Sequence, residues 1–386
     1  MFLEQTIHRN KQLVQTCFQL HQKYKIRPDT YVVDLDQLLE NAKQMLDVSR
    51  NNNIDLYFML KQLGRNPYIA KELVRIGYKG AVVVDFKEAA VLMQHNIPIC
   101  NVGHLVQMPR CMVQELVNYG CEYFTIFSIE KAKEINEAAE NAGIIQKVLL
   151  KVVGPQDMIY SGQTAGFYVE SLEEVIKELK KLDNIKVSGV TSFPSFLFDE
   201  KEEKIIPTPN LSTLMKACSI LESKGIQVEN VNAPSATCSY SLEQMKSYRV
   251  NSAEPGHGLT GTTPMHANGE CVEKPAVCYV SEISHNFKGK AYCYGGGHYR
   301  RSHVANAIVG KNLENSQRYQ VIPPTDESID YYFGLDREAN VSDTVIMSFR
   351  FQIFVTRSDV VLVKGIHKGN AEIVGIYNSL GDEIHE

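Results

Sequence analysis

The stretch LYFMLKQLGRNPYIAKELVRIGYKGAVVVDFKEAAVLM, residues 56–93, contains two short apolar runs. One run precedes a helical stretch and the other follows it. The runs are LYFML (56–60) and GAVVVD (80–85). Apolar runs that are this short and nearly continuous indicate strands buried on both faces, as in the parallel sheets of βα units. This stretch therefore predicts two consecutive parallel strands joined by a helix.

The same rhythm recurs roughly every 25 residues through most of the chain. Helices such as 36–48 and 128–142 are expected between the runs, the second one opening with Ser128 as its cap. About eight βα units predict an α/β fold of the (β/α)8 TIM-barrel type. A doubly wound sheet fits less well, because no G-x-G-x-x-G follows the first strand. The other predicted strands are TYVVDL (30–35), IPICNVG (97–103), YFTIFS (123–128), KVLLKVV (147–153), KVSGVTSF (186–193) and VENVNAP (228–234).

The two ends of the chain differ in texture from the repeat. Residues 2–26 have apolar positions at helical spacing, which predicts an N-terminal helix. After about residue 265, runs such as KPAVCYVSEI and DVVLVKG are broken by Gly and Asn, which predicts a smaller, mostly β domain. The expected organisation is an N-terminal helical extension (1–27), a barrel (28–265) and a C-terminal mostly-β domain (266–386), since 386 residues are enough for two cores.

Composition excludes several classes of function. A net charge of -5 gives no electrostatic footprint for nucleic acid or an anionic membrane. The apolar runs are strand-sized and no signal peptide is expected, so no membrane segment is predicted. Nine cysteines without a C-x-x-C pair are typical of reduced, buried thiols in a cytoplasmic protein. No His/Cys cluster has metal-ligand spacing, so no metal is expected.

The chemistry of such a barrel lies at the carboxyl ends of its strands. A lysine there is unusual, because an amine that leaves water has a lowered pKa, and a neutral amine is what Schiff-base chemistry needs. Taken alone, however, Lys61 also fits a solvated loop lysine. The residues at the expected strand ends are Lys61, Asp85, Asn101, Ser128, Lys151, Ser192, Ser235 and Glu254.

Two later segments have the composition of anion-binding loops. VNAPSATCS (231–239) offers small residues and hydroxyls after the last predicted strand, where barrels often hold a phosphate on backbone amides. SAEPGHGLTG (252–261) adds an acid and several glycines, which let the backbone approach an anion closely. Either segment alone is weak, since E-P-G is also an ordinary turn.

The order of these motifs resembles the fold-type III pyridoxal 5'-phosphate (PLP) enzymes, which include alanine racemase, eukaryotic-type ornithine decarboxylase, D-serine dehydratase and D-threonine aldolase. The resemblance covers the barrel, 28–265, and more loosely the β domain. The resemblance extends to uncharacterised proteins of the YhfX type, for which an amino-acid racemase activity is expected. The segments that carry it are TYVVDLDQLLENAKQM, YFMLKQL, GAVVVDFKEAAVLM, LKVVGPQDMIYSGQTAGF, NAPSATCS, EPGHG and CYGGGHYRR.

The resemblance implies a role for each matching residue. Lys61 would hold PLP as a Schiff base and serve as one acid/base at Cα, and Glu254 would pair with the pyridine nitrogen. Arg65, four residues past the lysine, could reach the phosphate, although a solvated arginine is the simpler expectation. The phosphate would be bound mainly by backbone N–H groups of Ser235, Ala236, Thr237, Gly256 and His257.

The second base and the substrate contact are assigned in the same way. Tyr294, in CYGGGHYRR, matches the tyrosine that alanine racemases donate across a dimer interface, so a homodimer is expected. Cys293 and His298 are its rivals, and core packing is the alternative for any of the 19 tyrosines. Arg350, in a strand predicted at MSFRFQ (347–352), could hold a substrate carboxylate as a bidentate fork, although a structural ion pair is the simpler expectation.

Three departures from alanine racemase matter. Glu254 stands where those enzymes place an arginine, and a carboxylate keeps the ring nitrogen protonated, so the ring becomes a full electron sink that favours a quinonoid intermediate. This puts alanine itself in doubt as substrate. No arginine follows Lys151 in QTAGF, so the family's carbamylated lysine is not expected, and Ser192 stands where alanine racemases have a histidine.

The resemblance predicts a PLP-dependent enzyme acting at Cα of an amino acid, most simply an amino-acid racemase. An amino-acid decarboxylase or a D-amino-acid dehydratase or aldolase of the same fold is the alternative. A non-catalytic PLP-binding protein would leave the β domain unexplained, and a barrel for another phosphorylated ligand is a third possibility. Which amino acid is the substrate stays open.

Overall fold

The computed structural model describes residues 2–269 and 271–385. The chain divides into two compact units, each made of segments that are not contiguous in sequence. The barrel unit comprises Lys43–Leu60 and Pro67–Gly256, and the β unit comprises Met1–Ala42, Lys61–Asn66 and His257–Glu386. The predicted boundaries, at residues 27 and 265, divide the chain into consecutive segments and therefore do not describe units made of alternating segments.

The barrel unit contains a closed ring of parallel strands, which confirms the predicted TIM-type barrel followed by a mostly-β domain. Each strand pairs in parallel with the next around the ring, and the last one pairs with β2 and closes it. The ring strands are β2 (Asp55–Phe58), β3 (Gly80–Val82), β4 (Ile99–Val102), β5 (Tyr123–Ile126), β6 (Gln146–Val153), β8 (Ile185–Thr191), β11 (Asn230–Asn232) and β12 (Ser252–Ala253).

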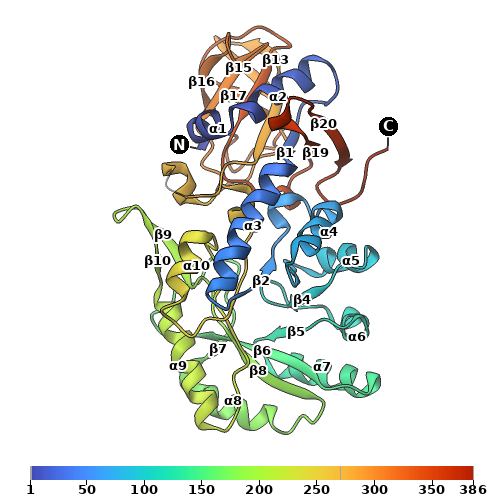
Figure 1. Cartoon of the computed structure of the whole chain (residues 1–386), viewed down its shortest axis with the longest axis vertical. Helices are drawn as coiled ribbons and strands as arrows, with labels where there is room; N and C mark the ends of the chain where they lie inside the picture. Colours follow the sequence, from blue (N-terminus) through green and yellow to red (C-terminus); the bar gives the residue numbers. More distant parts are fainter. Residues whose placement is uncertain (1, 270, 386) are drawn as a thin grey trace. The chain divides into compact units, whose positions relative to one another are not determined.

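Helices connect these strands (Figure 1), and two of them, α5 and α7, begin at polar caps. Ser128 Oγ accepts from Lys131 N at 3.2 Å, as predicted, and Asp85 Oδ1 accepts from Glu88 N at 2.8 Å. The helices are α3 (Leu35–Asn51), α4 (Pro67–Ile76), α5 (Phe86–Gln94), α6 (Arg110–Tyr119), α7 (Ile129–Ala142), α8 (Leu172–Leu179), α9 (Pro209–Ser223) and α10 (Ser239–Met245), with η2 (Val169–Ser171), the short strand β7 (Phe167–Tyr168) and the hairpin β9 (Phe196–Asp199)–β10 (Lys204–Pro207) between them.

In the β unit, strands that are far apart in sequence form one antiparallel barrel with an extension. The barrel closes because β13 pairs with both β14 and β18, and β1, β19 and β20 extend the sheet beyond β13 (Figure 1). The strands are β1 (Thr30–Asp34), β13 (Val277–Phe287), β14 (Lys290–Tyr294), β15 (Asn306–Gly310), β16 (Gln317–Ile322), β17 (Tyr332–Leu335), β18 (Thr344–Met347), β19 (Asp359–Lys364) and β20 (Glu372–Tyr377); the short helices are η1 (Lys61–Leu63), α11 (His257–Thr260), η3 (Pro264–Asn268), η4 (Ile353–Val355) and η5 (Ile366–Lys368).

The prediction that residues 30–35 form the first barrel strand was wrong. β1 pairs antiparallel with β13 and parallel with β19, so it belongs to the β unit. It is buried at every position, and a central strand covered on both faces produces the same continuous apolar run as a parallel barrel strand. The strand that completes the barrel is Ser252–Ala253, which is too short to produce such a run.

The single N-terminal helix predicted for residues 2–26 is two helices, α1 (Phe2–Arg9) and α2 (Lys11–Gln22), separated by Asn10. Asn10 Oδ1 accepts from Leu13 N at 3.1 Å, which caps α2. The helices bury apolar side chains against the β-unit sheet, among them Phe18 against the Val32 region of the core.

The cysteines are buried thiols as expected, with the exception of exposed Cys111. None of the helices in the described ranges combines the length and apolar character needed to cross a bilayer.

Candidate functional site

The lumen of the parallel barrel contains a hydrogen-bonded polar layer. Thr125 Oγ1 donates to Asn101 Oδ1 at 2.8 Å. On the other side of the ring, Thr191 Oγ1 donates to Asn232 Oδ1 at 2.8 Å, and Asn232 Nδ2 donates to Ser252 Oγ at 3.0 Å. All five side chains are buried. Barrels of this type are usually filled by bulky branched side chains, so a polar layer marks the lumen as a place for polar ligands.

Glu254 follows the eighth strand at the mouth of this lumen. It lies two residues after Ser252, so its side chain leaves the strand on the same side. Glu254 Oε2 is 3.8 Å from Nε2 of His104, and both side chains are buried. The His104 ring also packs edge-on against Phe193, with centroids 5.6 Å apart. A buried carboxylate needs a donor or a counter-charge, and His104 would provide the charge when protonated.

Lys151 brings an amine into the same layer. It is in register with Thr191 on the neighbouring strand, and paired residues of parallel strands project to the same side. Only 2% of its surface is exposed, and Nζ lies 5.3 Å from the centroid of the Phe127 ring. Burial lowers the pKa of the Lys151 amine to about 8.

This buried amine predicts a pH-dependent stability. Between pH 8 and 10.5 the unfolded chain holds a proton that the folded one has lost, and below pH 8 the charged amine opposes folding in full. Lys151→Met removes that penalty. The variant is therefore expected to be more stable than the wild type at pH 7, and this difference in the free energy of unfolding should be about 3 kcal/mol larger at pH 7 than at pH 10.5. Urea denaturation of both proteins at the two pH values measures it. Equal gains at the two pH values would contradict the lowered pKa.

The loop after β11 has the backbone of an anion-binding turn. Ser235 and Ala236 have φ of 95° and 50°, two consecutive residues in a region that L-amino acids rarely adopt. Successive N–H groups in such turns form a concavity that binds anions. Thr237 is 3% exposed, and no described residue hydrogen-bonds its buried Oγ1. Two of the residues predicted to bind phosphate, Ser235 and Ala236, thus form a left-handed turn next to an unpartnered buried hydroxyl.

In the β unit, Lys61 begins the short helix η1. Two residues earlier in the chain, the Met59 N–H donates to the Pro255 carbonyl at 2.9 Å. Gly64 has φ +64°, and a Cβ there would lie 3.2 Å from Ile353 Cγ2, so only glycine lets η1 pack this closely on η4. Arg65 is 4% exposed and lies 5.5 Å over the Phe354 ring. The expectation of a solvated Arg65 was therefore wrong.

His257 and Arg350 are brought together in the β unit. Arg350 Nε donates to His257 Nε2 at 3.3 Å, which fixes the proton of the neutral imidazole on Nδ1, 2.9 Å from Thr262 Oγ1. Burial, then the charges of Arg350 and Lys61, hold the pKa of His257 well below its usual value. Three predicted site residues, Lys61, His257 and Arg350, thus share one environment, in which His257 is a neutral acceptor that orients Arg350. Arg350 lies beyond β18 and not within a strand as predicted.

Tyr294, the predicted second base, ends β14 at the surface of the β unit. It is 37% exposed, and its ring lies 6.0 Å from that of Tyr332. Its rival Cys293 is fully buried, and burial raises the pKa of that thiol to about 12, so it stays protonated at neutral pH. Burial also lowers the pKa of the other rival, His298. Within the chain itself, the structure leaves Tyr294 facing outward.

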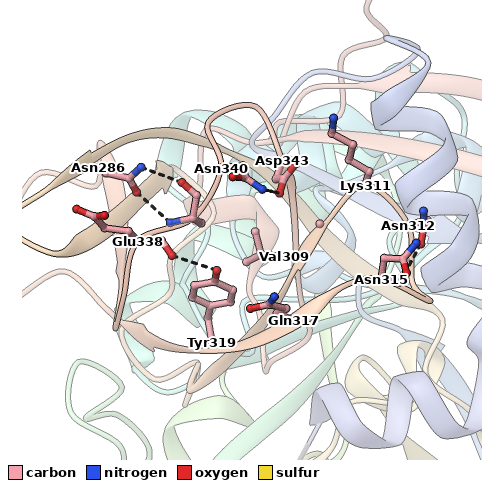
Figure 2. A pocket seen from close by; sticks show the side chains of 12 residues that line it. Asn286, Val309, Lys311, Asn312, Asn315, Gln317, Tyr319, Glu338, Asn340 and Asp343 are labelled. Atoms are coloured by element: carbon pink, nitrogen blue, oxygen red, sulfur yellow. Dashed lines mark hydrogen bonds between the residues drawn. The ribbon is translucent and has the colours of Figure 1, made fainter.

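A separate concavity of about 670 Å³ lies in the β unit and contains none of the predicted site residues. Figure 2 shows that its polar groups largely satisfy one another. Asn286 exchanges two hydrogen bonds with the Ala339 backbone, at 2.8 and 3.1 Å, and Asn340 Nδ2 donates to Asp343 at 3.2 Å.

Reading strand ends from sequence found Glu254 but missed its partner. His104 lies two residues beyond the end of β4, past the point where a list of strand-end residues stops. The signal was its place in NVGH at the mouth of a predicted strand. Asp85 and Ser128, both on that list, are helix caps, and Ser192 Oγ donates to the Val152 carbonyl at 3.0 Å.

The sequence of the chain matches known protein families in two regions. Residues 33–264 match the family described as alanine racemase, N-terminal domain, and residues 278–373 match the YhfX-like C-terminal domain. The "Uncharacterized protein YhfX" of Escherichia coli K12 is 46% identical over the full length of both chains.

Solved structures share the fold at low sequence identity. D-threonine aldolase from Filomicrobium marinum has a TM-score of 0.67 at 15% identity, covering 92% of this chain and 95% of the other. Alanine racemase from Clostridium difficile 630, in complex with cycloserine, has a TM-score of 0.63 at 18% identity, covering 91% and 98%. The chain therefore belongs to the family that joins an alanine-racemase-type N-terminal barrel domain to a YhfX-like C-terminal domain.

Proposed function

We propose that this protein is a PLP-dependent enzyme that acts at Cα of an amino acid, most simply as an amino-acid racemase. Members of the alanine racemase N-terminal domain family are PLP-dependent, and their fold serves racemases and aldolases alike. The observation that carries the proposal is a buried carboxylate, Glu254, held beside His104 at the mouth of the parallel barrel.

The residues of the barrel unit fit PLP. The left-handed turn at Ser235 and Ala236, with the buried hydroxyl of Thr237, suits a phosphate monoester. Backbone N–H groups of Gly256 and His257 are assigned to the same phosphate. Covalent attachment is assigned to Nζ of Lys61, held by η1. When bound in this way, PLP withdraws electrons from Cα and makes its C–H bond acidic.

Glu254 is assigned the task of keeping a proton on the ring nitrogen. A carboxylate does this only while it is ionised, and burial opposes ionisation. His104, with Nε2 at 3.8 Å, offsets that cost and orients the carboxylate. His104 is thus a positioning residue, acting through Glu254. Lys61 Nζ, once released from PLP, is assigned to move the Cα proton on one face.

The test of this function is proton exchange at Cα. The purified PLP-loaded protein is incubated in D2O with L-amino acids that include alanine, serine, lysine and ornithine, followed by NMR and chiral chromatography. Deuterium at Cα together with the D-isomer is the expected result for a racemase. Release of CO2 without the D-isomer would contradict racemisation and establish a decarboxylase. Absence of any reaction at Cα with every amino acid would contradict the proposal.

Tyr294 is proposed to act in the site of a neighbouring subunit. It is exposed beside Tyr332, which is also exposed, and exposed aromatic side chains are common at interaction surfaces. Tyr294→Phe alone is expected to lower racemisation about 10²-fold or more, since a positioned acid/base contributes on that scale. A homodimer in which each site combines Lys61 of one subunit with Tyr294 of the other predicts complementation.

Mixing Lys61→Ala and Tyr294→Phe proteins, each inactive, should restore about a quarter of wild-type activity, because half of the dimers are mixed and each has one intact site. The measurement is racemase activity after subunit exchange, with sedimentation to verify dimers. Failure of dimers to complement would mean that Tyr294 acts within its own chain or not at all.

Arg350 is proposed to hold the substrate carboxylate, oriented by its bond to His257. A charged hydrogen-bond pair is worth about 1.5–3 kcal/mol, so Arg350→Gln is expected to raise KM roughly 10- to 100-fold. The PLP dissociation constant should stay within about 2-fold of the wild type if this assignment is right. A weakened PLP affinity with unchanged KM would move Arg350 to the cofactor phosphate.

A further inference from the structure

We propose that Lys151 binds an anionic oxygen at the mouth of the barrel, either a substrate carboxylate or the phenolate of PLP. The inference rests on the proposed function for the identity of the anion, and on the barrel unit alone for the site. Lys151 has no role in the chemistry assigned so far. The ligand class it selects is a compact anion that can accept a charge-assisted hydrogen bond.

The position of Lys151 supports a ligand and not a structural role. It stands on the lumen side of β6, in register with Thr191 and two residues from Leu149, which is in register with Thr125. Both threonines belong to the polar layer of the lumen. An apolar side chain would fill this place without the cost of burying an amine.

The partners of Lys151 leave its charge uncompensated by the protein. Among residues 2–269 and 271–385, no carboxylate pairs with its amine, which lies over the face of the Phe127 ring. Burial alone lowers its pKa to about 8, so the amine is mostly protonated at neutral pH. Lys151 is 2% exposed, its protonated amine can donate three hydrogen bonds, and a bound anion is the partner that would use them.

Lys147 provides a matched control on the same strand. It also lies over an aromatic ring, with Nζ 5.6 Å from the Tyr123 centroid. In contrast to Lys151, its side chain is 40% exposed and pairs with Glu229 at 3.1 Å. Lys147→Met therefore removes a lysine from β6 without touching the proposed site.

The experiment compares wild type, Lys151→Met, Lys151→Gln and Lys147→Met as full-length proteins. The first measurement is the PLP dissociation constant of the apo proteins. The second is the shift in thermal unfolding temperature that acetate and succinate produce, at pH 7, in the apo and PLP-loaded proteins. Unfolding curves without ligand verify that each variant folds, and two substitutions guard against failure of one.

Loss of carboxylate affinity by about 10- to 100-fold in both Lys151 variants would identify a substrate carboxylate as the ligand. A loss of that size in PLP affinity, with carboxylate affinity unchanged, would identify the phenolate. Lys147→Met should change neither. If both affinities of the Lys151 variants stay within about 2-fold of the wild type, the proposal is overturned. A carbamate signal on Lys151 from 13C-labelled bicarbonate would also overturn it, because the group would then be an anion.

The outcomes separate this inference from the proposed function. If the wild type binds no PLP, the proposed function fails. Carboxylate binding that depends on Lys151 but not on Lys147 would still establish the anion site. If PLP binds and the Lys151 variants behave as wild type, only the anion site fails.

Discussion

Lys61→Ala protein is expected to lose its covalent cofactor and to lose activity by on the order of 10³-fold or more, because both the attachment and one acid/base are removed together. Alanine leaves no amine to attack the PLP aldehyde. The fold should persist, because Gly64, directly after the short helix that Lys61 opens, allows the close approach to η4. Residual PLP would be bound only through its phosphate and ring contacts.

The decisive measurement is mass spectrometry after borohydride reduction of the PLP-loaded protein. The wild type should carry a phosphopyridoxyl group on Lys61, and Lys61→Ala should carry none. Lys79→Ala serves as the control, since Lys79 is a partly exposed lysine paired with Asp55. The proposed function would lose its basis if the wild type carried the adduct on another lysine, or if Lys61→Ala were as active as the wild type.

Much of the barrel could be predicted from local pattern, and the failures have a common cause. Five of its strands, β2 to β6, are buried at nearly every position and lie in short apolar runs, so periodicity locates them. β1 produces the same run for a different reason, because it is the centre of an antiparallel sheet. Pairing partners that are hundreds of residues apart decide between the two, and a single sequence does not contain that information.

The closing strand β12 illustrates the opposite failure. It has two residues, and its stability comes from pairing with β2 and β11 and not from its own composition. The approximate position of Glu254 could nevertheless be predicted, because E-P-G lies just after this strand. The sequence therefore predicted a barrel over the correct part of the chain, but it counted residues 30–35 as a barrel strand in place of β12.

The candidate site residues also differ in whether local sequence or tertiary pairing identifies them. Residues within one segment, such as Ser235, Ala236 and Thr237, could be predicted as a loop because their spacing is local. Contacts between segments, such as His104 with Glu254 or Arg350 with His257, depend on tertiary packing. Isolated histidines and arginines have many ordinary explanations, so their pairing is visible only in the structure.

The Glu254–His104 pair supports the second large effect. Glu254→Gln keeps the size of the side chain but removes its charge, so the proton on the PLP ring nitrogen loses its partner. Cα-proton exchange is expected to fall by about 10²- to 10⁴-fold, the range that acid–base assistance supplies, while PLP stays bound through the loop at Ser235. His104→Gln should reduce exchange less, because it acts only by holding Glu254.

A double-mutant cycle tests whether the two residues act as one unit. If His104 acts through Glu254, adding His104→Gln to Glu254→Gln should cost almost nothing more, whereas independent residues would give additive losses in the free energy of activation. The measurement is the rate of deuterium exchange at Cα for the four proteins, together with their PLP dissociation constants. Glu229→Gln is the control, since Glu229 directly precedes β11 and pairs with Lys147 near the start of β6, at the opposite end of the strands from Glu254. Wild-type exchange in Glu254→Gln would show that a neutral partner at the ring nitrogen suffices, and the electron-sink argument that distinguishes this protein from alanine racemase would be wrong.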